Sequence, residues 1–418
     1  MKKKIIIFLT IFIITLLFIA SIIFLKDARK KRSWPFNSGL VLHLPQWVKY
    51  YAYKFTNPKD NILTTQFYKI KLEYINIPYT KSIGGGGSIN QIDPKNVLIT
   101  LNDGTSFNFN LEDKTFDKFN NTFEKKYVSI RDVTVTQNKK EIYVLAVINA
   151  EPECKKIILD KYNLKTKNRD LLSNNERIWK SEKLCNNPME NNGGGRVIKY
   201  KNDIFVSTGF FAQNINSGIF EYSQNIKSSF GKIIKISKQN NSYSSEVYSI
   251  GHRNPQGLFV SKKFNKIYST EHGPQGGDEL NLILKGKNYG WPCISYGAKY
   301  SYSFKKDSEI WPSKENLKKI GCDFTKNFQA PVFAWSPSIG ASQGLEYSGL
   351  EFPEFNNNFL ISSLKATSIY RVKMLTQDKI INLERIFINE RIRDLVVLRS
   401  GKILIYTDGG NLILISRT

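Results

Sequence analysis

The stretch Lys402-Ile-Leu-Ile-Tyr-Thr-Asp-Gly-Gly-Asn-Leu-Ile-Leu-Ile415 contains two short apolar runs separated by Asp408-Gly-Gly410. Both runs are rich in β-branched residues, have the length of a strand and are bounded by turn residues. The same pattern of short apolar runs separated by turn residues recurs along most of the chain, and no long amphipathic helical pattern competes with it. We therefore predict strands at Asn96–Leu101, Glu141–Ile148, Asp203–Thr208, Lys232–Ile236, Lys266–Thr270, Asn358–Ser363, Ser368–Lys373, Lys402–Thr407 and Asn411–Ile415.

Many short strands at regular spacing indicate an all-β sandwich, barrel or propeller. A chain of 418 residues with one repeated style favours a β-propeller, although no strict sequence period is visible. The last run, Asn411–Ile415, is placed to complete a blade that begins near the N-terminus of the domain. Such a closure joins the ends of the ring and removes exposed strand edges.

The N-terminal segment differs from the rest of the chain. Met1-Lys-Lys-Lys4 precedes an apolar run, Ile5–Leu25, that is long enough to cross a hydrocarbon core of ~30 Å as a helix. A cleaved secretory signal is the alternative, but the run is long and Lys26–Arg32 follows in place of a cleavage site. We expect an uncleaved transmembrane anchor over residues 1–32, a juxtamembrane connector over 33–65 and the propeller over 66–418. Basic residues on both sides of the run leave the orientation open.

The net charge of +25 would suit a protein that binds nucleic acid or an anionic surface. However, the lysines are spread along the whole chain, and no helix-turn-helix, zinc-finger or RNA-recognition signature is present. We therefore favour a bias in composition and expect no nucleic-acid partner.

The four cysteines are Cys154, Cys185, Cys293 and Cys322. None forms a CxxC motif and only three histidines are present, so a zinc site has almost no support. An even number of cysteines fits an exported domain with disulfides. Three connectivities are possible, of which the local pairing closes the shortest loops, and four buried free thiols are the alternative.

Polar residues gather in the segment 251–292, between strand-like runs. Arg253 and Asn254 precede a proline, and Arg presents a planar fork that suits a carboxylate. Gly273-Pro274 leaves carbonyl oxygens free for a hard cation such as calcium, and Asp278 and Glu279 add negative charge. Each of these residues taken alone also fits an ordinary turn or a surface ion pair.

Three further cations lie outside this segment. Arg391 and Arg393 would lie on one face of a strand, because side chains alternate along it, and Lys365 follows another strand. Cations on separate loops of a propeller can converge on a small polyanion.

The chain resembles the soluble glucose/sorbosone dehydrogenase family, which uses pyrroloquinoline quinone (PQQ). The resemblance is strong from about Gly193 onward. The matching pieces are His252-Arg-Asn-Pro-Gln-Gly257, Glu271-His-Gly-Pro274, Gly277-Asp-Glu-Leu-Asn281, Asn288-Tyr-Gly-Trp-Pro292, Trp335-Ser-Pro-Ser-Ile339, Ser363-Leu-Lys365, Arg391-Ile-Arg-Asp394 and Thr407-Asp408.

The resemblance implies a six-bladed β-propeller with the cofactor at one mouth of the axis. It implies that Arg253 and Asn254 contact the quinone, and that the Gly273 and Pro274 carbonyls hold calcium. The resemblance also implies that three further residues neutralise the PQQ carboxylates: Lys365, Arg391 and Arg393. A sugar or another polyol would give a hydride to the quinone while a histidine removes the hydroxyl proton. The electron acceptor is not implied, and the family's usual compartment, the cysteines and the anchor together indicate an extracytoplasmic domain.

The chain departs from the family pattern at the catalytic histidine. In the family's His-x-Gly-Gly-Arg segment this chain reads Asn192-Gly-Gly-Gly-Arg196, and an amide has no basic nitrogen. Asp278 and Glu190 are the alternative proton acceptors. The family's early Gly-Leu-Leu-Gly segment is also missing, with Ser82–Gly87 as a distant counterpart. The sequence thus predicts a membrane-anchored PQQ-dependent dehydrogenase with an altered base, and the alternative is a propeller that has become a binding or scaffold module.

Overall fold

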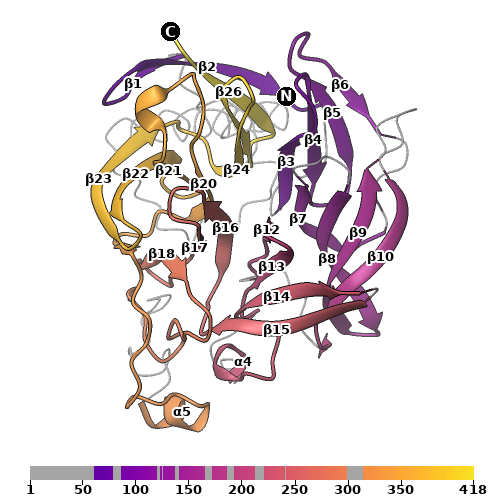
Figure 1. Cartoon of the computed structure of the whole chain (residues 1–418), viewed down its shortest axis with the longest axis vertical. Helices are drawn as coiled ribbons and strands as arrows, with labels where there is room; N and C mark the ends of the chain where they lie inside the picture. The colour runs from indigo at the N-terminus through magenta and orange to yellow at the C-terminus, as the bar shows by residue number, and fades with distance from the viewer. Residues whose placement is uncertain are drawn as a thin grey trace, which may run out of the picture. The chain divides into compact units, whose positions relative to one another are not determined.

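The computed structural model describes residues 61–78, 86–119, 123–124, 126–136, 141–164, 172–185, 193–211, 221–240, 242–298 and 314–418. These residues belong to one compact unit, Asp60–Thr418, which is built almost wholly of antiparallel strands (Figure 1). The predicted anchor (residues 1–32) and most of the predicted connector (33–65) lie outside the described residues. Within the described part of the chain, no helix is long and apolar enough to span a membrane.

The strands form six sheets, each a blade, and in blades 1 to 5 the first strand in chain order is the innermost. Blade 1 consists of β3 (Gly87–Gln91), β4 (Asn96–Leu101), β5 (Ser106–Asn110) and β6 (Phe116–Lys118). Blade 2 consists of β7 (Ser129–Val135), β8 (Glu141–Glu151), β9 (Cys154–Leu164), β10 (Leu172–Lys180) and β11 (Leu184–Cys185). Blade 3 consists of β12 (Val197–Tyr200), β13 (Asp203–Thr208), β14 (Lys232–Gln239) and β15 (Ser242–Ile250). Blade 4 consists of β16 (Pro255–Ser261), β17 (Lys266–Glu271), β18 (Asp278–Ile283) and β19 (Phe333–Trp335). Blade 5 consists of β20 (Ala341–Glu346), β21 (Phe359–Ser363), β22 (Ser368–Thr376) and β23 (Lys379–Phe387). Short helices α4 (Glu221–Gln224), α5 (Lys314–Lys319) and η4 (Pro353–Phe355) lie between strands.

The sixth blade joins the two ends of the unit. It contains β24 (Ile392–Val397), β25 (Ile403–Thr407) and β26 (Asn411–Arg417), and on its outer side β2 (Lys69–Asn76) and β1 (Ile62–Thr64). β2 pairs antiparallel with β26 from Ile70–Arg417 to Asn76–Asn411. The predicted closure of the ring by the last strand is therefore confirmed, and so is the six-bladed all-β fold.

The hydrophobic core is divided among the junctions between blades. The innermost strands β3, β7, β12, β16, β20 and β24 contact one another in a ring. A buried apolar cluster lies between each pair of neighbouring blades, for example Phe259 and Tyr268 of blade 4 against Phe359 and Val372 of blade 5. Every blade therefore depends on both neighbours to bury its faces.

Two disulfides join neighbouring segments of the chain. Cys154 is bonded to Cys185, and Cys293 to Cys322, which confirms the local pairing among the three possibilities. The second bond packs with Leu317 of α5 and holds the long insertion between β18 and β19.

Candidate functional site

The residues that the sequence singled out lie at one mouth of the axis. Each blade follows the same up-and-down order, so the start of its first strand and the loop between its second and third strands face the same end. Arg253 and Asn254 precede β16, Arg391 precedes β24, and Lys365 lies between β21 and β22. The loop 272–277, between β17 and β18, lies at the same mouth.

The Arg253 guanidinium lies against a pair of aromatic rings that contact each other. Its central carbon lies 5.6 Å from the ring centroid of Phe210 and 5.0 Å from that of Trp291, a contact that suits a planar cation. Nη1 donates to the carbonyl oxygen of His272 over 2.9 Å, and the backbone amide donates to Glu271 Oε2 over 3.3 Å. Arg253 is therefore fixed through both its side chain and its backbone.

A buried network of hydrogen bonds holds the Glu271 carboxylate in place. The Oε1 atom of Glu271 lies 2.6 Å from His252 Nδ1 and accepts hydrogen bonds from Ser269 and Asn281, while His252 Nε2 lies 2.8 Å from Ser249 Oγ. Burial alone would raise the pKa of Glu271, but His252 and these donors outweigh it and hold the pKa below its usual value. Ser249, His252 and Glu271 have the connectivity of a hydrolytic triad. Because none is more than 3% exposed, they support Arg253 and cannot reach a substrate.

Asn254 links blade 3 to the histidine of the mouth. Its Oδ1 accepts the backbone amide of Gly194 over 2.8 Å, which leaves Nδ2 facing His272 Nδ1 at 3.3 Å. Burial lowers the pKa of His272, and the nearby guanidiniums of Arg253 and Arg393 counteract the negative charge of Asp278, which would raise it. The imidazole is therefore neutral near pH 7. With Nδ1 as the acceptor, its proton lies on Nε2.

Asp278 organises the loops around this mouth. Oδ1 accepts hydrogen bonds from the Gly273 amide over 3.1 Å and from Ser338 Oγ over 2.7 Å. Oδ2 accepts the backbone amides of Gly340 and Ala341. With four donors on a fully buried carboxylate, Asp278 has a structural role that argues against it as the proton acceptor.

Two backbone carbonyls in this loop are available to a cation. A Cβ atom at Gly273 would lie 2.3 Å from the carbonyl oxygens of Gly276 and Gly277, so only glycine fits there. The carbonyls of Gly273 and Pro274 accept no hydrogen bond from a residue that the structure describes. They are hard oxygen donors of the kind calcium prefers. In the described ranges, no group of three or more His, Cys, Asp or Glu side chains could hold a metal. A cation here would therefore rely on backbone oxygens and on the cofactor itself.

Arg391 and Arg393 share one carboxylate, as their spacing on one strand face predicts. Arg391 Nε donates to Asp408 Oδ2 over 3.0 Å, and Arg393 Nε donates to Oδ1 over 2.9 Å. Burial would raise the pKa of Asp408, but Arg393 and Arg391 outweigh it and hold the pKa below its usual value. Arg391 Nη1 also reaches the carbonyl of Leu364 at 3.4 Å, beside Lys365. Lys365 is exposed and makes no ion pair with a described residue.

The glycine segment before β12 passes between three blades. Asn192 and Glu190 lie outside the described residues, which resume at residue 193. At Gly194, φ is +57° and an added Cβ would lie 2.8 Å from the carbonyl oxygen of Pro255. The space and the left-handed conformation both require glycine. The segment that follows Asn192 is therefore packed directly against the start of β16.

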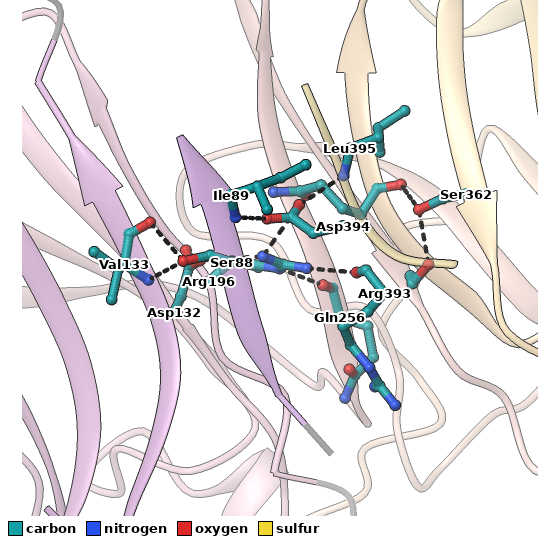
Figure 2. Close-up of polar contacts among 12 residues, drawn as sticks. Ser88, Ile89, Asp132, Val133, Arg196, Gln256, Ser362, Arg393, Asp394 and Leu395 are labelled. Atoms are coloured by element: carbon teal, nitrogen blue, oxygen red, sulfur yellow. Dashed lines mark hydrogen bonds and ion pairs between the residues drawn. The ribbon is translucent and has the colours of Figure 1, made fainter. Parts of the chain in front are cut away.

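Arg196 ends this segment and lies among polar residues of several blades (Figure 2). Its Nη1 lies 3.0 Å from Asp132 Oδ1 in blade 2 and 3.4 Å from Asp394 Oδ1 in blade 6. Nε donates to the carbonyl of Gln256 in blade 4, and Nη2 to that of Arg393 in blade 6, both over 2.9 Å. One guanidinium, 3% exposed, thus ties blade 3 to three others.

The two carboxylates around Arg196 extend the network further. Asp394 Oδ2 accepts the backbone amide of Ile89 in blade 1, and Asp132 Oδ2 accepts that of Val197 in blade 3, each over 2.9 Å. Burial raises the pKa of Asp394 to about 6, because Arg196 offsets only part of the cost and Asp132 adds a second negative charge. Burial likewise raises the pKa of Asp132 despite Arg196. The cluster has one negative charge in excess when both acids are ionised.

Arg131 is a further cation beside the segment that follows Asn192, and no motif in the sequence pointed to it. A Cβ at Gly195 would lie 2.9 Å from Arg131 Cβ, and the guanidinium lies 5.9 Å from the ring centroid of Phe211. Arg131 is an isolated residue inside β7, without a local motif. Only the packing of blade 2 against blade 3 reveals its position.

Comparison with known proteins gives matches along most of the unit. The family model described as Glucose / Sorbosone dehydrogenase matches residues 88–415. The aldose sugar dehydrogenase YliI of Escherichia coli strain K12 is 29% identical over 229 residues, which cover 52% of this chain and 57% of that protein. The chain spans about half the length of the curated relatives it matches.

Solved structures share the fold. The apo-form of the soluble aldose sugar dehydrogenase from Escherichia coli superposes with a TM-score of 0.68 at 20% identity, covering 84% of this chain and 99% of that one. The PQQ-bound form of an aldose sugar dehydrogenase from Streptomyces coelicolor gives a TM-score of 0.59 at 18% identity, covering 83% of this chain and 98% of that one. At these identities the likeness establishes the propeller and its blade order.

Proposed function

Because the chain belongs to the glucose/sorbosone dehydrogenase family, we propose that it binds PQQ at the mouth described above and oxidises a sugar or polyol. The observation that carries the proposal is the group of cations that three blades bring to this mouth: Arg253, Lys365, Arg391 and Arg393. Guanidinium and ammonium groups are the donors that a cofactor with several carboxylates requires.

The residues of the mouth fit such a cofactor. Arg391 and Arg393 carry more positive charge than Asp408 neutralises, and Lys365 adds an exposed ammonium. These three would hold the carboxylates of PQQ, while Arg253, which lies beside Trp291, would face the quinone. Calcium would be held by the free carbonyl oxygens described above and would polarise the quinone.

When bound, PQQ supplies the hydride-accepting chemistry. The chain must bind the sugar and accept a proton from its hydroxyl. Asn192 has no basic nitrogen and Asp278 is saturated with donors, whereas Glu279 is half-buried at the start of β18. Its Oε2 accepts a hydrogen bond from Asn281 Nδ2 over 2.9 Å, and its Oε1 accepts none from the described residues. We therefore assign Glu279 as the candidate proton acceptor.

The proposal is tested by titrating the full chain with PQQ in a mild detergent with calcium, followed by absorbance. A panel of aldoses and polyols is added afterwards. Saturable binding and bleaching by one sugar supports a dehydrogenase. Binding without bleaching supports a cofactor-binding module, and no binding refutes the proposal. Lys365→Gln should weaken binding about tenfold, as expected for loss of a charge-assisted contact. Lys326→Gln, which alters an exposed lysine paired with Asp323, should leave binding unchanged.

We also propose that the apolar run 5–25 anchors the chain in a membrane, with the propeller on the extracytoplasmic side. The two disulfides support an oxidising compartment. Extraction of membranes with alkaline carbonate should leave the chain in the pellet, and protease added to intact spheroplasts should cleave it. Release by carbonate or full protection would contradict the anchor or the orientation, respectively.

A further inference from the structure

We infer that Arg196 is the positioning residue of the mouth: it keeps the cofactor-facing residues of blades 4 and 6 in register with the segment that follows Asn192. The role in cofactor binding rests on the proposed function. The coupling among blades is independent of the proposed function, and it can be measured on the chain without cofactor.

The contacts of Arg196 lead directly to the cations of the mouth. Nη2 binds the carbonyl of Arg393, whose own guanidinium holds Asp408. Nε binds the carbonyl of Gln256, whose side chain donates to Asn254 Oδ1 over 2.8 Å. A shift in either peptide unit would therefore move a residue assigned to the cofactor, and a displacement of ~1 Å at such a site can cost about a hundredfold in rate.

The backbone on the N-terminal side of Arg196 is held in the same way. The Gly194 amide donates to Asn254 Oδ1 over 2.8 Å, and the Gly195 amide donates to the Pro255 carbonyl over 3.2 Å. Arg196 itself donates its amide to Ser207 Oγ over 3.0 Å. The glycine segment 193–195 is thus held against the start of β16, and its C-terminal end is fixed by the Arg196 guanidinium.

A planar fork is essential to this arrangement. Nη1, Nη2 and Nε each point to a different blade or chain segment, over distances of 2.9 to 3.4 Å. Lysine retains the charge but has one compact ammonium, which cannot reach three diverging acceptors. Arg196→Lys therefore removes the positioning and keeps the net charge of the cluster.

Arg371 provides a matched control. It is also buried, at 1% exposure, and its guanidinium binds Glu384, Asn358 and Gln66 over 2.6 to 2.9 Å, on the third strand of blade 5. Arg371→Lys should cost comparable stability. None of its partners belongs to the mouth, so any difference between the two variants in cofactor binding reports on positioning.

The experiment measures hydrogen–deuterium exchange of the full chain without cofactor, and then PQQ affinity. Arg196→Lys should increase exchange together at residues 193–197, 253–257 and 391–395, and weaken PQQ binding at least tenfold. Arg371→Lys should increase exchange in β21–β23 and change PQQ affinity less than twofold. Should Arg196→Lys fail to fold, Asp132→Ala, which removes both the nearest acceptor of Nη1 and the acceptor of the Val197 amide, should loosen the same three segments to a smaller extent.

Two results would overturn the inference. One is a folded Arg196→Lys or Asp132→Ala chain whose exchange at the three segments matches wild type. The other is equal loss of PQQ affinity in Arg196→Lys and Arg371→Lys. If the wild-type chain binds no PQQ, the proposed function fails, and the exchange comparison still decides whether Arg196 couples the blades.

Discussion

Replacing Asp394 by Asn is expected to stabilise the folded chain at neutral pH, although it removes a charge 3.4 Å from Arg196. The cluster on the axis contains two buried carboxylates and one guanidinium, so one negative charge is in excess. An amide oxygen can still accept the backbone hydrogen bond from Ile89 that Asp394 Oδ2 accepts, as the protonated acid would, whereas both forms weaken the bond that Oδ1 accepts from the Leu395 amide. It also leaves the ion pair between Arg196 and Asp132 balanced.

The size of the effect follows from the pKa of Asp394, which burial raises from 3.8 to about 6. Between about pH 4 and about pH 6 the folded chain retains a proton that the unfolded chain releases. The free energy of unfolding therefore falls as pH rises through this range. A shift of about two pH units corresponds to about 3 kcal/mol. Asn resembles the protonated acid. The free energy of unfolding of the variant should therefore equal that of wild type near pH 4 and exceed it by about 3 kcal/mol above pH 7.

The assay is urea unfolding at pH 4.5 and 7.5, followed by tryptophan fluorescence. Glu384→Gln is the control, since Glu384 is the carboxylate that pairs with buried Arg371, at 2.7 Å. Removing it leaves a charge uncompensated and should cost about 3–5 kcal/mol at both pH values. If Asp394→Asn is less stable than wild type at pH 7.5 while Glu384→Gln behaves as expected, the excess-charge reasoning is wrong.

Three further predictions concern chemistry and stability. Burial, together with Glu271, raises the pKa of Glu279 to about 8. Turnover should therefore increase as pH rises through 8, and Glu279→Gln should lose at least tenfold in rate together with this dependence; an unchanged profile would exclude Glu279 as the acceptor. Replacing the Cys293–Cys322 disulfide by two serines should lower the free energy of unfolding by about 3 kcal/mol in urea, given its sequence separation of 29, and no change would show that the bond constrains little. Asn192→His should raise turnover and change PQQ affinity less than twofold, whereas equal turnover would mean that the proton leaves by another route.

The strands that the sequence predicts are those with an apolar face. Asn96–Leu101 and Asp203–Thr208 occur with the predicted bounds, because both are interior strands that bury almost every residue. β15 (Ser242–Ile250) was missed, since it is the outermost strand of blade 3 and most of its residues are polar and not buried. Outer strands are specified by backbone pairing with the next strand, which leaves little trace in the pattern of apolar residues.

The candidate site was predictable only where its partners are near in sequence or share a motif. Arg391 immediately precedes β24 and Arg393 lies in it, so the alternation of side chains along an extended chain places both on one side, and both reach Asp408. Asp132 and Arg196 are 64 residues apart and meet only because blades 2 and 3 share an axis. No local pattern connects them, so neither the central cluster nor the position of Arg131 could be read from the sequence.

The cations of the mouth do not carry equal weight as evidence for a cofactor. Arg253 binds a backbone carbonyl and two aromatic rings, and Arg393 shares Asp408 with Arg391, so the propeller would need these residues even with an empty mouth. Lys365 is different, because its ammonium is exposed and pairs with no described carboxylate. A residue without a structural partner contributes to function or to nothing. Lys365→Gln should therefore leave the free energy of unfolding within about 0.5 kcal/mol of wild type. A clear loss of PQQ affinity in that variant would thus be a loss of a cofactor contact, whereas the same loss in an Arg253 or Arg393 variant could arise from a disturbed fold.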